Sequence, residues 1–132
     1  MATTVGQYRI GELAAKVGLT ERTIRYYEEV GLLESVKRVE GGRRVYTDDD
    51  VRRLRFIQKL KMLGLSLQEM LELEQMYRRE RSNTQVLPRL VELLDAHLAT
   101  LGDRMSELAA LRDEIRSYRE HVSERLKEEG GK

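Results

Sequence analysis

Apolar residues recur every three or four positions in a short stretch near the start of the chain, which predicts a helix over residues 10–17. The repeat consists of Ile10, Leu13, Ala14 and Val17. Gly18 suits the end of this helix, because glycine adopts left-handed backbone conformations without steric cost. Thr20 is a good N-cap for a second helix over residues 21–30. Two short helices joined by a tight, glycine-containing turn are typical of a helix-turn-helix.

The next segment, residues 35–47, has two strand-like pieces on either side of Gly41 and Gly42, which predicts a β-hairpin, or wing. Thr47 then caps a third helix over residues 48–63, whose first turn is acidic. Ser66 with Glu69 three residues later fits a capping box for a fourth helix that extends to about residue 79.

The longest pattern covers residues 86–126, where apolar residues follow a heptad repeat. The residues predicted to form its seam are Leu87, Val91, Leu94, Leu98, Leu101, Met105, Leu108 and Ile115. The register slips near Arg112, where a polar residue takes a seam position. About 40 residues give roughly 60 Å of helix. The stripe needs a partner, and a second copy of the chain is the simplest one.

These patterns predict a mainly α fold with two parts. Residues 1–80 form a winged helix-turn-helix domain, and residues 84–127 form a helix that dimerises as a coiled coil. Residues 128–132 are expected to be a frayed tail.

Composition narrows the choice of function. The chain of 132 residues has no cysteine, which excludes disulfides and thiolate metal or redox sites. No apolar run approaches membrane-spanning length and no signal peptide is visible, so no membrane partner and a cytoplasmic location are expected. No nucleophile–base pair or glycine-rich phosphate loop points to an enzyme, and no cofactor is expected.

The charge is distributed unevenly along the chain. Residues 1–64 carry a net charge of +4 and residues 65–132 carry a net charge of −3, so the positive charge lies with the predicted helix-turn-helix.

Four short motifs resemble the N-terminal domain of the MerR family of transcription regulators. They are Arg9-Ile10-Gly11-Glu12-Leu13, Thr23-Ile24-Arg25-Tyr26-Tyr27-Glu28, Gly31-Leu32-Leu33 and Arg44-Val45-Tyr46-Thr47. The resemblance covers about half the chain, and the long C-terminal helix also matches the family plan. It implies an antiparallel homodimer that binds a pseudo-palindromic promoter operator, bends and untwists the DNA beside RNA polymerase, and responds to an effector.

Candidate DNA contacts lie mainly in the second helix. Arg25 can bind a phosphate or a guanine, and the resemblance makes it a contact residue; the alternative is a surface ion pair with a neighbouring glutamate. Arg22 and Thr23 lie early in the helix, where such helices meet base edges. The alternative for Arg22 is a solvated surface side chain that contacts no DNA. Tyr26 and Tyr27 point about 100° apart, so one is expected in the core and the other at the DNA backbone.

In the wing, Arg43, Arg44 and Tyr46 are candidate phosphate contacts, with a core-facing position as the alternative for Tyr46. Lys37 adds charge that a solvated hairpin face explains equally well. Lys61 matches a lysine that reaches phosphate in the resembling family.

The sequence gives the least information about the effector. Metal- and redox-sensing members of the resembling family use cysteines, and His97 and His121 lie 24 residues apart on one predicted helix. A non-metal effector is therefore expected. A small organic molecule, either anionic or uncharged, bound between subunits near Tyr77 is one candidate, with ordinary packing between domains as the alternative. Two further functions stay open: a metal-responsive regulator and a non-specific architectural DNA-binding protein.

Overall fold

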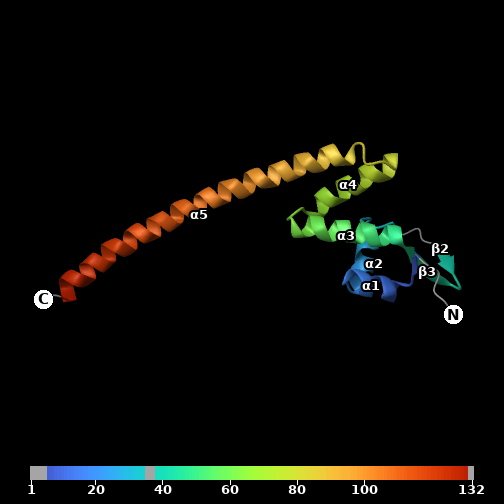
Figure 1. The fold of residues 1–132 in the computed structure, drawn as a ribbon, viewed down its shortest axis with the longest axis horizontal. Coiled ribbons are helices and arrows are strands. Elements are labelled where there is room, and N and C mark those ends of the chain that lie inside the picture. Colours follow the sequence, from blue (N-terminus) through green and yellow to red (C-terminus); the bar gives the residue numbers. More distant parts are fainter. Residues whose placement is uncertain (1–5, 35–37, 131–132) are drawn as a thin grey trace. The chain divides into compact units, whose positions relative to one another are not determined.

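The computed structural model describes residues 6–34 and 38–130. Its elements follow the chain in the order β1 (Gln7–Tyr8), α1 (Ile10–Val17), α2 (Glu21–Glu29), β2 (Arg38–Glu40), β3 (Arg43–Thr47), α3 (Asp48–Met62), α4 (Leu67–Glu80) and α5 (Val86–Gly130). The chain divides into two compact units, residues 1–90 and 91–132. The mainly helical fold with a winged helix-turn-helix and a long C-terminal helix is confirmed (Figure 1).

The helix-turn-helix has the local chemistry that its sequence predicts. Gly18 ends α1 with a φ of 73°, and its N–H donates to the carbonyl of Ala14 at 2.9 Å. The Thr20 hydroxyl accepts from the N–H of Thr23 at 3.1 Å and so caps α2. Leu13 of α1 and Ile24 of α2 are fully buried, which fixes the two helices against each other.

The wing is a tight hairpin. Its register pairs Glu40 with Arg43, and both turn glycines have positive φ, 58° at Gly41 and 76° at Gly42. Two consecutive left-handed residues define a type I′ turn, which matches the twist of antiparallel strands. The structure adds a strand that sequence analysis missed: β1 pairs with β3, so the sheet order is β1-β3-β2.

The core of the first unit lies between the helix-turn-helix, β3 and α3, because α1 contacts α2, β3 and α3. Its most deeply buried large side chains are Leu13, Ile24, Leu32, Leu33, Tyr46 and Leu54. α3 begins with a capping box in which Thr47 and Asp50 satisfy each other's backbone groups, as expected for a helix that starts in an acidic turn. α4 begins with the predicted capping box of Ser66 and Glu69.

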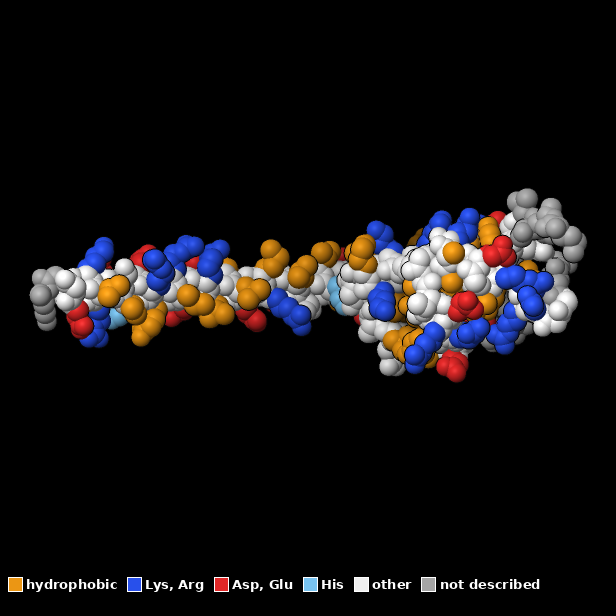
Figure 2. All heavy atoms as spheres, turned by 90° about the horizontal axis from the view of Figure 1, so that it is seen from below, with side chains coloured by type: hydrophobic (Ala, Val, Ile, Leu, Met, Phe, Trp, Pro, Cys, Tyr) orange, Lys and Arg blue, Asp and Glu red, His pale blue; other side chains and the backbone are white. Residues whose placement is uncertain are grey.

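α5 is a single helix of 45 residues. It extends to Gly130 and so includes residues 128–130, the start of the segment expected to be a frayed tail. Ion pairs in this last segment, Arg125 with Glu129 at 3.9 Å and Lys127 with Glu124 at 4.0 Å, have the i,i+3 and i,i+4 spacing that supports helix. Hydrophobic side chains run along the helix in Figure 2, and Leu98, Met105 and Leu108 are 65%, 63% and 65% exposed.

Candidate DNA interface

The exposed face of α2 carries three of the five α2 side chains that the sequence predicted to contact DNA. Arg22, Arg25 and Tyr26 are exposed, and their spacing of three and four residues places them on one side of the helix. Ile24, Tyr27 and Glu28 form the buried side. The question of the two tyrosines is therefore resolved: Tyr27 belongs to the core, and Tyr26 keeps 46% of its surface exposed.

Arg25 pairs with Glu21 at 3.4 Å, which is the ion pair considered as its alternative. Both side chains remain about half exposed or more, at 63% and 48%. Such a pair contributes little to stability because water screens it. The Arg25 guanidinium can therefore exchange this carboxylate for another anion at little cost.

A hollow of about 830 Å³ lies beside this face of α2, and we call it the arginine cradle. It is lined by Arg9, Ile10, Gly11, Arg25, Glu28, Glu29, Arg43, Arg44 and Tyr46. Its lining comes from the start of α1, from α2 and from the wing strand β3. Four of the nine lining residues are arginines, so the cradle is suited to an anion.

Glu28 organises the cradle from beneath. Its carboxylate accepts from Arg44 at 3.1 Å and from the hydroxyl of Tyr46 at 2.8 Å. The Glu28 side chain is 4% exposed, whereas that of Arg44 is 56% exposed. One edge of the Arg44 guanidinium is thus fixed by a buried carboxylate while the rest faces solvent, which orients a charged group that bulk water would otherwise leave mobile.

Tyr46 takes the core-facing alternative, since only 1% of its surface is exposed. Burial, followed by the hydrogen bond to Glu28, raises the pKa of Tyr46 to about 12. The tyrosine therefore stays neutral and donates to Glu28. The hydroxyl of Tyr46 is thus already bonded to Glu28 inside the fold, which favours a positioning role over a direct phosphate contact.

The remaining predicted DNA-contact residues do not all lie at the arginine cradle. Arg43 is exposed and lines the cradle. Lys61 is exposed near the end of α3 and does not line it. The Thr23 hydroxyl lies 2.9 Å from that of Thr20, within the cap of α2. Lys37 lies outside the described residues.

Sequence reasoning did not identify Arg9 and Glu28 as residues of the cradle. Each of them appeared only as part of a motif. A signal for Glu28 was available in the helical spacing, because Ile24 and Glu28 are four residues apart and so share the buried face.

Tyr8, which precedes α1, donates to Asp48 at 2.6 Å, and Lys16 lies 5.3 Å from the centre of its ring. The hydrogen bond to Asp48 is the main cause that raises the pKa of Tyr8. This residue joins β1 to the acidic first turn of α3, a contact that supports the wing from the side of the sheet opposite β2.

Within the described ranges, the structure contains no helix long and apolar enough to cross a bilayer. The same residues include no group of three or more His, Asp or Glu side chains placed to hold a metal ion.

A helix-turn-helix, a two-stranded wing and an arginine-lined hollow between them define a winged helix-turn-helix DNA-binding protein. The sequence matches the family model described as MerR HTH family regulatory protein over residues 8–76, and the one described as MerR, DNA binding over residues 51–118. The chain belongs to the MerR family of transcriptional regulators, whose members are DNA-binding proteins and not enzymes.

Individual relatives agree with this assignment. The chain is 37% identical to the HTH-type transcriptional regulator ZntR homolog of Haemophilus influenzae over 112 residues, which cover 85% of this chain and 81% of the relative. It is 36% identical to the nodulation protein NolA of Bradyrhizobium elkanii over 83% of this chain, but it spans only 46% of that protein's length. The match to ZntR of Escherichia coli is 50% identical over 66 residues and likewise spans 47% of the relative.

Two solved structures share the fold over most of the chain. HiNmlR, described as a MerR family regulator lacking the sensor domain and bound to promoter DNA, superimposes with a TM-score of 0.59 at 30% identity, covering 81% of this chain and 79% of that one. PbrR691 from Ralstonia metallidurans CH34, in complex with lead(II), gives a TM-score of 0.64 at 34% identity and 85% coverage of both chains.

Proposed function

We propose that this protein binds a pseudo-palindromic promoter operator as an antiparallel homodimer, distorts the promoter DNA beside RNA polymerase, and is switched by a non-metal effector. The observation that carries the DNA-binding part is the arginine cradle, in which Arg9, Arg25, Arg43 and Arg44 converge from three separate elements. HiNmlR, whose structure superimposes on this chain, is bound to promoter DNA, and this supports the DNA-binding part of the proposal.

In this proposal α2 enters the major groove and presents Arg22 and Arg25 to base edges. The wing follows the backbone, where Arg43 and Arg44 bind phosphates. Phosphate contacts fix the register of the protein on the duplex, and base contacts select the sequence. Glu28 and Tyr46 hold Arg44 in place and do not touch the DNA.

The stripe of α5 supports the homodimer. Leu87, Val91, Leu94, Leu98, Leu101, Met105 and Leu108 are spaced alternately by four and three residues, and Leu98 is the middle one of the seven. An antiparallel pair centred on Leu98 matches Leu87 with Leu108 and places Leu98 beside its own copy, so that these seven positions meet one another.

The non-metal effector is supported by the composition of the chain. There is no cysteine, and the two histidines lie 24 residues apart, roughly 36 Å along a helix. Thiolates and clustered imidazoles are the side chains that bind soft and borderline metals most tightly. The competing metal-responsive function predicts that a transition metal co-purifies or alters DNA binding, which elemental analysis and a metal titration measure.

The test of DNA recognition is a binding titration at fixed salt against the duplex upstream of the protein's own gene, with a scrambled duplex of the same composition as control. We expect a preference of at least about 10³-fold for the operator. Equal binding to both duplexes, with a steep salt dependence, would instead favour a non-specific architectural protein.

A further inference from the structure

A second hollow lies within residues 32–87, where α3, α4 and the first turn of α5 meet, and we call it the α3–α4 cavity. Its volume is about 230 Å³. Most of its wall is apolar, and six of its fourteen lining residues are apolar and 6% exposed or less: Leu32, Ile57, Leu60, Met70, Leu73 and Val86. Phe56 and Leu87 also line it and are 41% and 56% exposed, so they form its rim.

One end of the α3–α4 cavity is polar. The guanidinium of Arg53 lies over the ring of Tyr77, 4.2 Å from its centre, and donates to the carboxylate of Glu74. The other oxygen of Glu74 accepts from Arg78 at 2.9 Å. At the rim, Arg52 pairs with Asp49 at 3.3 Å. Every charged side chain in the lining thus has an opposite charge beside it.

This balance indicates the kind of ligand that the cavity accepts. A charged ligand would bring an uncompensated charge into an apolar site, which is costly. An uncharged aromatic ligand gains from leaving water and from contact with the stacked Arg53 and Tyr77. A cavity of roughly 150 Å³ can hold benzene. The α3–α4 cavity is larger and has room for a one- or two-ring molecule.

We propose that the α3–α4 cavity is an effector site for a small, uncharged, predominantly aromatic molecule. The proposal rests on the function proposed above, since it identifies the ligand class and the site of the non-metal effector.

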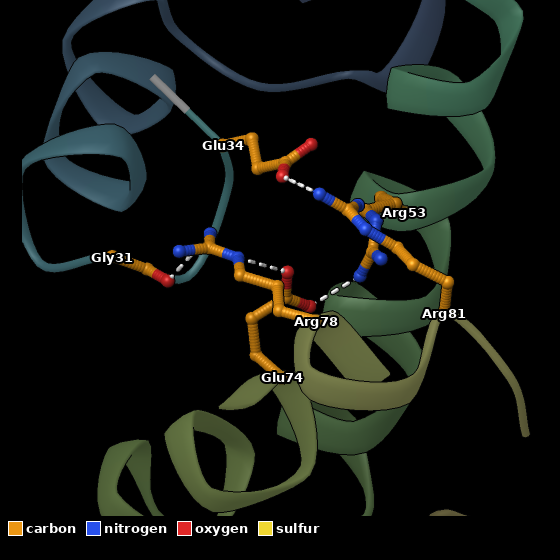
Figure 3. A network of polar contacts seen from close by, with 6 residues as sticks. All are labelled: Gly31, Glu34, Arg53, Glu74, Arg78 and Arg81. Atoms are coloured by element: carbon orange, nitrogen blue, oxygen red, sulfur yellow. Dashed lines mark hydrogen bonds and ion pairs between the residues drawn. The ribbon is translucent and has the colours of Figure 1, made fainter. Parts of the chain in front are cut away.

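The hydrogen bonds around Glu74 connect the cavity to the recognition helix (Figure 3). Arg78, whose Nε donates to Glu74, also donates from Nη2 to the carbonyl of Gly31 at 2.9 Å. Gly31 directly follows the C-cap of α2. Arg81 pairs with Glu34 in the same loop at 2.8 Å. A ligand that changes the contact between Arg53 and Glu74 therefore acts on the residues that set the end of α2.

Binding is measured on the full chain without DNA. The probes are indole, which is neutral, and indole-3-carboxylate, which carries the same ring and a negative charge. The chain has no tryptophan, so the emission of indole is read without a protein indole background. We expect saturable binding of indole, weakened at least about tenfold by the carboxylate. Absence of indole binding up to about 1 mM, or equal binding of both probes, would overturn the proposal.

The position of the ligand is tested by two matched variants. Leu73→Phe fills the cavity and is expected to weaken indole binding at least about tenfold. Leu65→Phe makes the same change at a buried site that does not line the cavity, and it should bind indole like the wild type. Thermal melting establishes that each variant folds. If Leu73→Phe does not fold, nuclear Overhauser contacts from indole to the methyl groups of Met70 and Val86 in the wild type decide, and their absence contradicts the assignment.

Regulation is then measured with the operator duplex. We expect saturating indole to change operator affinity at least about threefold, and Arg78→Met to bind indole but to lose this effect. Indole binding with unchanged operator affinity would overturn the regulatory role. Leu101→Lys places a charge on the α5 seam and is expected to break the dimer. If only this variant binds indole, the regulatory role is also overturned, because a second copy of the chain would then fill the cavity in the wild type. If the wild-type protein shows no operator selectivity in the absence of indole, this result contradicts the DNA-binding function proposed above and not the binding of indole to the cavity.

Discussion

Residues 1–90 and the stripe of α5 use the same apolar residue types in opposite ways. Leu13, Ile24 and Leu54 are fully buried within the first unit, whereas Leu98, Leu101 and further leucines along α5 are more than half exposed. Amphipathic helices gain most of their stability from covering the apolar face. The first unit covers most of its own apolar faces, whereas the exposed stripe of α5 is the face that the proposed homodimer would cover. Under that proposal, folding and assembly are separable along this chain.

The largest expected effect comes from Leu101→Lys, which places a charge on the seam of α5. We expect the dimer to be lost while the first unit keeps its melting transition. Operator affinity should fall at least about a hundredfold, because two half-sites are then bound independently. Light scattering and DNA titration measure these two results.

The matched control for that variant is Thr100→Lys, which adds the same charge to an exposed neighbour outside the seam. It should leave the dimer intact. A dimer that survives Leu101→Lys would move the interface away from the heptad stripe.

Tyr46→Phe is expected to destabilise the first unit by about 2 kcal/mol at neutral pH, because it removes a donor from the buried carboxylate of Glu28. The folded-state pKa of Tyr46 is about 12, above the ordinary value of 10.0. The unfolded chain therefore loses this proton first, so the contribution of Tyr46 is present below pH 10 and declines as pH rises toward 12.

The measurement for Tyr46→Phe is denaturant unfolding of both proteins between pH 7 and about pH 12. The difference between wild type and variant should shrink with rising pH, and the dimer should be unaffected. A difference that stays constant would show that the hydroxyl of Tyr46 is not held neutral by Glu28.

Arg25→Ala is expected to alter neither stability nor assembly, because its ion pair with Glu21 is exposed. Operator affinity should fall about tenfold, and the salt slope by about one if the partner is a phosphate. Glu29→Ala, which removes a carboxylate that lines the same cradle, is the control and should not weaken binding. Unchanged affinity in Arg25→Ala would place the recognition surface elsewhere.

Most helices of this protein could be predicted because their signals are local. Thr20, Ser66 and Gly18 mark helix ends through contacts only a few residues away. The strand β1 could not be predicted, since two residues are too few to show an alternating pattern, and its pairing with β3 spans about 40 positions.

The candidate site was predictable only in part, because contacts between residues far apart in the sequence position some of its side chains. The exposed arginines of α2 and the wing follow from the motif, but the position of Tyr46 depends on Glu28, which lies 18 residues away in sequence. The Arg53–Glu74 pair is separated by 21 residues and is likewise set by tertiary packing. Buried polar contacts between distant residues therefore account for what the sequence patterns did not reveal.

The contrast between a self-contained unit and a helix that we propose to pair with a second copy is tested most directly by disulfide trapping. The chain has no cysteine, so single cysteines can be introduced without background. Antiparallel pairing predicts that Leu98→Cys forms a disulfide dimer with itself, and that Leu87→Cys is trapped by Leu108→Cys but not by itself. Self-trapping of Leu87→Cys would indicate parallel helices, and the absence of disulfide dimers in every combination would contradict the assignment of the α5 stripe as the dimer interface.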